Sequence, residues 1–228
     1  MRKLLLALTL VFLAGHFLMA QQSQYTTAAD SDAEAVALVK SLRAKYDGFK
    51  TLQAVFKLEI SLPGQPVETQ QGTISRKGDL IRFKLGTQEG IITDQAAYLI
   101  QHGNKEVMIS NLPEEGEQSG VLTPQTLFNF YEGDNYVLSI RGENIFKGRK
   151  VKIIELKPVD RSESEFSKLR LLVDAAKKEL VSVKAFTPDG ANFTFHLDKT
   201  SGNVALDENT FVFDKAAFPG YYVEDLRY

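Results

Sequence analysis

The feature that most constrains this chain is a long series of short segments in which apolar and polar residues alternate. Between residues 52 and 62, every second side chain is apolar, at Phe56, Leu58, Ile60 and Leu62. This alternation is typical of a β-strand with one buried and one solvated face. Similar segments occur at 67–76, 81–85, 90–94, 97–101 and 107–110, and again at 136–141, 150–157, 169–174, 180–186 and 191–197. Turn sequences such as Pro63-Gly64-Gln65-Pro66 join them. The chain is therefore predicted to be mainly β, with antiparallel strands in a single curved sheet, a sandwich or a barrel.

The segment 67–76 is the least regular of these strands. Apart from Ile74 its residues are mostly polar, so it is expected to be exposed or to lie at an edge of the sheet.

A helix is expected before the first strand, from about residue 31 to residue 46. Ser31 and Glu34 have the spacing of a capping box. One apolar stripe follows at helical spacing, formed by Ala35, Leu38, Val39, Leu42 and Tyr46. Adding this helix to the strands predicts an α+β domain.

A second short helix is expected in the middle of the chain. Thr123 suits its N-cap, Pro124 its first turn and Gly133 its C-terminal end. Its apolar side chains cover most of the helix circumference and are Leu127, Phe128, Phe130 and Tyr131. Such a helix needs apolar neighbours on more than one side. It is either a lid over a concave sheet or a connecting helix packed on the core.

Residues 1–20 have the pattern of a cleaved signal peptide. Arg2 and Lys3 are followed by an apolar run from Leu4 to Phe12, and Ala20 is a small residue at a plausible cleavage point. We therefore expect a periplasmic protein whose residues 21–228 form a single domain with a sizeable core. There is no cysteine, so this fold must rest on its core rather than on disulfides.

Charge and motif content exclude several functions. Residues 21–228 carry 25 basic against 29 acidic residues, so they lack the excess of positive charge that binding to nucleic acid or to an anionic membrane requires. The sequence contains no zinc-ligand spacing, phosphate loop or nucleophile elbow, so no metal or other cofactor is expected. His102 lies in an expected hairpin turn, and His196 and Asp198 are two residues apart on one strand, on the same face. That pair is weak evidence for catalysis, and we expect a protein that is not an enzyme.

Motifs in one order along the chain resemble a known family. They are the strand and turn Gly72-Thr73-Ile74-Ser75-Arg76-Lys77-Gly78-Asp79, the Thr93-Asp94 step, the Pro-initiated helix, Leu171-Leu172-Val173-Asp174 and the C-terminal run from Phe218 to Arg227. Over nearly all of residues 21–228 the chain is similar to LolA, the periplasmic carrier of outer-membrane lipoproteins. The resemblance implies a single curved antiparallel sheet, an open and unclosed β-barrel, covered by short helices. It also implies a monomer that takes acylated lipoproteins from an inner-membrane exporter and delivers them to an outer-membrane acceptor.

The resemblance assigns site residues as well. The apolar cavity is expected to be lined by strand residues and by the lid helix, at Phe56, Leu58, Ile60, Ile81, Phe83, Leu85, Leu127, Phe128 and Phe130. In the family an arginine in a Lys-Arg-Pro sequence latches the lid. Arg76-Lys77-Gly78 stands at that place here, so strict alignment makes Lys77 the latch, whereas a shift of one residue makes it Arg76. The expected acceptors are carbonyls at the end of the lid helix, near residues 130–132.

Two other functions stay open from the sequence. A lipid or acyl-peptide sensor on the same scaffold would regulate a partner instead of carrying cargo. A carrier of glycolipids or other small lipids has the same sequence features as a lipoprotein carrier.

Overall fold

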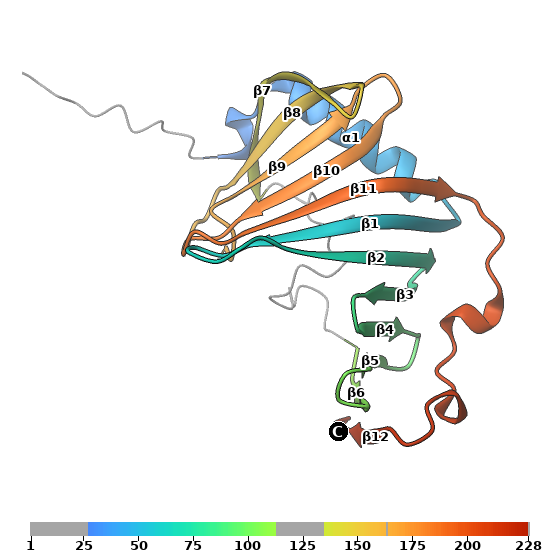
Figure 1. Cartoon of the computed structure of the whole chain (residues 1–228). Helices are drawn as coiled ribbons and strands as arrows, with labels where there is room; N and C mark the ends of the chain where they lie inside the picture. The colour runs from blue at the N-terminus through green and yellow to red at the C-terminus, as the bar shows by residue number, and fades with distance from the viewer. Residues whose placement is uncertain (1–26, 113–134, 163, 228) are drawn as a thin grey trace, which may run out of the picture.

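The structure is a computed structural model that describes residues 27–112, 135–162 and 164–227. One α-helix and twelve strands make up most of this part of the chain (Figure 1). The helix is α1 (Ala33–Asp47). The strands are β1 (Thr51–Ser61), β2 (Glu68–Lys77), β3 (Leu80–Leu85), β4 (Gln88–Ile92), β5 (Ala97–Gln101), β6 (Glu106–Ser110), β7 (Tyr136–Phe146), β8 (Arg149–Pro158), β9 (Lys168–Asp174), β10 (Glu179–Phe186), β11 (Asn192–Gly202) and β12 (Tyr222–Asp225).

All twelve strands belong to one sheet, in the order β12-β6-β5-β4-β3-β2-β1-β11-β10-β9-β8-β7. Neighbours are antiparallel except β12, which runs parallel to β6. The first strand lies in the interior because β1 pairs with β2 on one side and with β11 on the other. The sheet curves strongly, but its two edge strands, β7 and β12, do not pair with each other (Figure 1). This confirms the prediction of a mainly β fold built on a single curved sheet that is not closed into a barrel.

The polar segment β2 is largely exposed, as one of the two alternatives predicted, but it does not lie at an edge of the sheet, since it pairs with both β1 and β3. Its two buried residues, Gly72 and Ile74, lie on one face. One strand was not predicted. The strand β12 had no alternating pattern to reveal it, because a strand of four residues is too short to show one.

The main core lies on the face of the sheet that contacts α1, which we call the inner face; the other is the outer face. The helix buries Ala35, Val39, Leu42 and Tyr46 as one stripe, as the sequence predicted, with Leu38 half-buried beside them. Opposite them the sheet contributes inner-face side chains from β1, β2, β3 and β8–β11. Burial of this stripe holds α1 on the sheet.

The start of α1 differs from the expected capping box. The helix begins at Ala33, after Asp32 as its N-cap. The Ser31 hydroxyl accepts a hydrogen bond from Leu138 N (3.0 Å), and an Asp32 carboxylate oxygen accepts one from Ile140 N (2.7 Å). Both donors belong to the edge strand β7. Ser31, the expected cap, and Asp32, the observed N-cap, therefore both accept hydrogen bonds from an edge of the sheet.

A second, smaller core lies on the outer face. Residues 203–221 leave the end of β11, pass the short 3₁₀-helices η2 (Glu208–Phe211) and η3 (Lys215–Ala217), and run down the side of the sheet to β12 (Figure 1). Phe213 stacks on Tyr98 of β5 with ring centroids 4.5 Å apart. Beneath these rings β4–β6 bury Ile91, Ile100 and Val107. This C-terminal segment thus covers the outer face of β4–β6, which explains its aromatic content.

Glycines on the inner face make room for aromatic rings. A Cβ atom at Gly72 would lie 2.3 Å from Cζ of Phe56, and one at Gly90 would lie 2.1 Å from Cε1 of Phe83. Each ring therefore lies flat over a glycine of a neighbouring strand, which is a known way to compensate for glycine in a sheet.

We expect Gly72→Ala to destabilise the protein by about 1–3 kcal/mol, the usual cost of overpacking a core. The new methyl group meets both the fully buried Phe56 ring and, at 2.8 Å, the backbone oxygen of Lys84. Urea denaturation measures the effect. Gly103→Ala is the matched control, because a Cβ there meets nothing within 4 Å. Equal stability of the two variants would contradict this packing.

Candidate functional site: the apolar inner face

The inner face brings together the six cavity residues that the sequence predicted on strands. Phe56 of β1 lies opposite Gly72 of β2, and Gly72 lies opposite Leu85 of β3. The same rows continue into β11, where Phe195 and Phe193 lie opposite Leu58 and Ile60. All six belong to one hydrophobic cluster: Phe56, Leu58, Ile60, Ile81, Phe83 and Leu85. The other three predicted lining residues, Leu127, Phe128 and Phe130, lie outside the described residues, as does the targeting segment.

Burial divides these six residues into two groups. Phe56, Leu58 and Ile81 are buried, with at most 5 % of their surface exposed. Ile60, Phe83 and Leu85 are only half-buried, and so are the neighbouring inner-face residues Ile92 of β4 and Phe193 of β11. We call these five the open strip: Ile60, Phe83, Leu85, Ile92 and Phe193. Such an apolar surface can bind hydrocarbon, since its contact with water is unfavourable.

The structure places the two latch candidates on opposite faces. Arg76 lies opposite Leu52 and Ile81, both buried in the inner core, and its Nη2 donates a hydrogen bond to Tyr46 O at 2.9 Å. Lys77 points to the outer side, where its Nζ lies 3.9 Å from a carboxylate oxygen of the exposed Glu208. Of the two candidates Arg76 is therefore the one on the inner face, and its partner among the described residues is the C-terminal end of α1. The expected acceptors near residues 130–132 lie outside the described residues.

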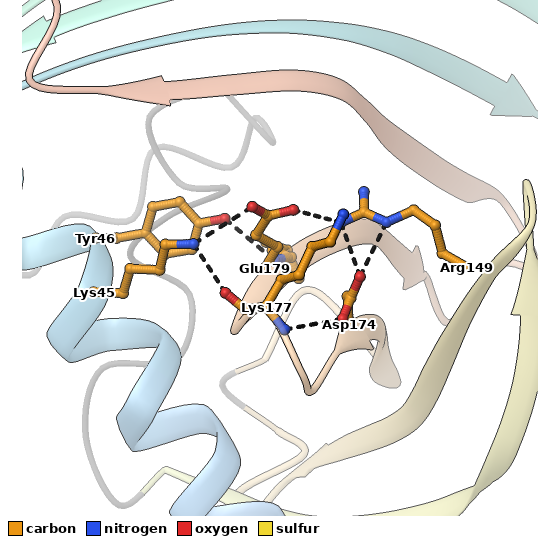
Figure 2. A network of polar contacts seen from close by, with 7 residues as sticks. Lys45, Tyr46, Arg149, Asp174, Lys177 and Glu179 are labelled. Atoms are coloured by element: carbon orange, nitrogen blue, oxygen red, sulfur yellow. Dashed lines mark hydrogen bonds and ion pairs between the residues drawn. The ribbon is translucent and has the colours of Figure 1, made fainter.

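The same end of α1 is tied to the β9–β10 hairpin by a polar network (Figure 2). Lys45 Nζ donates to Lys177 O at 3.0 Å and lies 3.5 Å from a Glu179 oxygen. The Tyr46 hydroxyl accepts a hydrogen bond from Leu180 N at 3.2 Å, and burial raises the pKa of this phenol. Arg76 and the network together fix the C-terminal end of α1 on the sheet.

Arg149 and Asp174 form the second half of this network. Arg149 Nε donates to Asp174 Oδ2 at 3.1 Å, and Arg149 also pairs with Glu179 (Figure 2). Burial of Asp174 favours a higher pKa for its carboxyl group, but hydrogen bonds from Lys177 N and Arg149 outweigh burial, and the pKa is lowered. A lowered folded-state pKa means that this carboxylate stabilises the fold above its unfolded pKa of about 3.9 and that the stabilisation is lost as pH falls.

Asp174→Asn is therefore expected to lower the free energy of unfolding by about 1–3 kcal/mol at neutral pH, the range for losing charge-assisted hydrogen bonds. The difference from the unchanged protein should shrink below about pH 4, where Asp174 itself becomes protonated. Urea denaturation over a pH series tests this. Asp198→Asn is the control, because Asp198 is exposed and its ion pair with Lys147 is worth about 0–1 kcal/mol. A difference that stays constant down to pH 2 would contradict the assigned pKa direction.

His196 and Asp198 do not form a catalytic pair. In the register of β1 with β11, Phe56 lies opposite Leu197 and Val55 opposite Lys199, so Asp198 is the extra residue of a β-bulge. The bulge interrupts the regular alternation from which their common face was predicted. His196 Nε2 lies 3.4 Å from a Glu59 oxygen, whereas Asp198 pairs with Lys147.

His102 is more constrained than the expected solvated turn histidine. Its Nδ1 lies 2.9 Å from the Tyr221 hydroxyl, and its Nε2 lies 3.5 Å from a carboxylate oxygen of the buried Glu89. It therefore helps to hold the C-terminal run on the outer face. Across the described residues, no group of three metal-ligating side chains is present.

Comparison with solved structures identifies the architecture. An uncharacterized conserved protein from Thermus thermophilus matches with a TM-score of 0.54 at 12 % identity, over 86 % of this chain and 99 % of that one. A putative outer membrane lipoprotein-sorting protein domain from Vibrio parahaemolyticus matches with a TM-score of 0.42 at 13 % identity, over 81 % and 98 %. A LolA superfamily protein from Nitrosomonas europaea matches with a TM-score of 0.39 at 10 % identity, over 79 % and 98 %. No protein-family model and no curated protein matches the sequence.

The chain has the open, LolA-like architecture that the sequence resemblance implied, with one curved sheet that is not closed into a barrel and a helix on its inner face. At 12 % identity the likeness to the Thermus thermophilus protein concerns this architecture alone.

Two further observations concern the described residues. No helix within residues 27–112, 135–162 and 164–227 is long and apolar enough to cross a membrane. A shallow surface depression lined by Gly48, Lys50, Thr51 and Asn203 lies where α1 joins β1. None of these four lining residues has a large apolar side chain, so the depression is a poorer site for hydrocarbon than the open strip.

Proposed function

We propose that this protein is a periplasmic carrier that binds the acyl chains of lipoproteins on its inner face and shuttles them from the inner to the outer membrane. The observation that carries the proposal is the open strip. Its five side chains are continuous with the main core, yet they stay half-exposed on the face that α1 partly covers. The LolA-like fold, which the family resemblance of the sequence also implies, supports the proposal. An inner-membrane exporter and an outer-membrane acceptor are the proposed partners.

The energetics require that the cargo is only partly buried. Burying one CH₂ group is worth about 0.8 kcal/mol, so three long acyl chains buried completely would contribute on the order of 30 kcal/mol. Noncovalent affinities saturate near about 20 kcal/mol, and a carrier must release its cargo. An inner face that packs on itself when empty offsets part of this energy. The buried half of the site, at Phe56, Leu58 and Ile81, is the part that has to open.

The proposed latch is Arg76. Its hydrogen bond to Tyr46 O holds the end of α1 against the sheet, which favours the closed and empty state. Cargo that enters beneath the helix must compete with this contact, so the latch weakens binding and helps release.

Native mass spectrometry of the protein purified from its own periplasm tests the proposed function. The expected result is a fraction of the protein in complex with a triacylated lipoprotein or its acylated N-terminal peptide. If free lipid or glycolipid co-purifies instead, the function is lipid carriage or lipid sensing and not lipoprotein transport. Protein that is always empty, even after cross-linking in cells, would contradict both.

A further inference from the structure

The outer face of β9 and β10 holds three cations around one aromatic ring. Lys168 Nζ lies 4.8 Å, Lys184 Nζ 5.0 Å and Arg170 Cζ 5.4 Å from the centroid of the Phe186 ring. All four side chains are half-buried. We call Lys168, Arg170, Lys184 and Phe186 the cationic cluster.

The fold itself uses only part of this charge. The buried Glu155 accepts a hydrogen bond from Arg170 Nη2 at 2.9 Å and lies 3.5 Å from Lys168 Nζ. These two cations satisfy the carboxylate. Lys184 contacts the ring, but it has no carboxylate partner among the described residues. Arg170 Nε is a buried donor that, in the same part of the chain, has no acceptor.

The register of the sheet places two cations of the cluster opposite each other, which is unfavourable for stability. Lys184 lies directly opposite Arg170 in the pairing of β10 with β9. Like charges in directly opposed positions destabilise a sheet. Sequences keep such local conflicts mainly where a function requires them. On its other side Arg170 lies opposite Glu155 of β8, which neutralises it, and its Nε is buried. The half-exposed ammonium of Lys184, which has no such partner in the described residues, is therefore the group that an anion from outside the chain can reach.

We propose that the cationic cluster docks an acidic segment of a partner protein. Carboxylates of that segment bind at Lys184 and Lys168, and an apolar side chain packs on Phe186. An anionic lipid bilayer is the weaker candidate. The whole chain has a net charge of −2, and three cations add little attraction to a membrane surface against that charge. The cluster lies on the outer face, so this proposal does not depend on what binds to the inner face.

Fluorescence anisotropy with a short labelled peptide of glutamate and leucine residues tests the proposal. We expect the unchanged protein to bind this peptide at low ionic strength, with affinity falling as salt is added. The double variant Lys168→Glu/Lys184→Glu should bind at least about tenfold more weakly, because attraction becomes repulsion. The neutral variant Lys168→Gln/Lys184→Gln should bind at an intermediate level, and it keeps the test valid where charge reversal prevents folding. Lys40→Glu, at an exposed position on α1, should leave peptide binding unchanged.

Several results would overturn the proposal. They are absence of peptide binding at low salt, equal binding by the unchanged protein and both cluster variants, and an equal loss in Lys40→Glu. Phosphatidylglycerol vesicles are assayed with the same proteins. Vesicle binding that requires the cluster, without peptide binding, would assign the surface to lipid instead. Binding of an apolar fluorescent probe to the inner face should not change in the cluster variants. This assay therefore distinguishes failure of the docking proposal from failure of the proposed carrier function.

Discussion

Phe83→Glu is expected to abolish binding of an apolar fluorescent probe, a loss of more than about a hundredfold in affinity. Phe83 is the half-buried centre of the open strip, and its ring lies over Gly90. A carboxylate at this place would have to lose its water when hydrocarbon covers it, which is unfavourable by several kcal/mol. Because the side chain is not fully buried in the empty protein, the cost to folding should stay modest, about 1–3 kcal/mol. Probe titration and urea denaturation measure the two effects.

The matched control is Thr73→Glu. Thr73 is exposed on the outer face of the adjacent strand β2, opposite Lys84, so the same charge is added without touching the open strip. It should bind the probe as the unchanged protein does. If Phe83→Glu instead unfolds the protein, the inner face is a solid core at this position and not a binding surface.

Arg76→Leu is expected to raise the affinity for cargo and to lower the free energy of unfolding of the empty protein. The variant loses the hydrogen bond to Tyr46 O, whose removal should lower the free energy of unfolding by about 1–3 kcal/mol. The same energy no longer opposes entry of the acyl chains, so affinity for a diacylated peptide should rise by about tenfold. Transfer of the peptide to acceptor vesicles should slow accordingly. Calorimetric titration and a fluorescence transfer assay give the two quantities.

Lys77→Leu separates the latch from a general effect of removing a cation. Lys77 lies on the outer side and is 46 % exposed, with only a long contact to Glu208. Neither affinity nor transfer rate should change. A larger effect from Lys77→Leu than from Arg76→Leu would favour the strict alignment with the family, and unchanged rates in both variants would mean that the protein closes by packing alone.

The sequence predicted most of the fold because its signals were local. Alternation over eleven residues located β1 to within one residue, and the apolar stripe located α1. The same alternation placed Phe56 and Phe83 on the same face, since parity along a strand determines which face a side chain occupies. These signals need no knowledge of distant partners.

What the sequence did not predict depends on contacts between distant segments. Ser31 had the composition of a helix cap, but its hydroxyl accepts a hydrogen bond from the edge strand β7, 107 residues away. The bulge at Asp198 interrupts the alternation of β11, and no residue pattern in that strand indicates it. Arg76 pairs with the end of α1, thirty residues earlier in the chain, a contact that depends on how α1 packs on the sheet.

Photo-crosslinking with a diacylated lipopeptide tests the central claim most directly. The peptide carries a photoreactive group near the end of one acyl chain, and the labelled residues are mapped by mass spectrometry. The account predicts labels on the open strip, at Ile60, Phe83, Leu85 and their neighbours, and a loss of these labels in Phe83→Glu. Labels confined to exposed apolar residues elsewhere, such as Ile145 (73 % exposed) and Val212 (53 % exposed), would contradict an inner-face site for acyl chains.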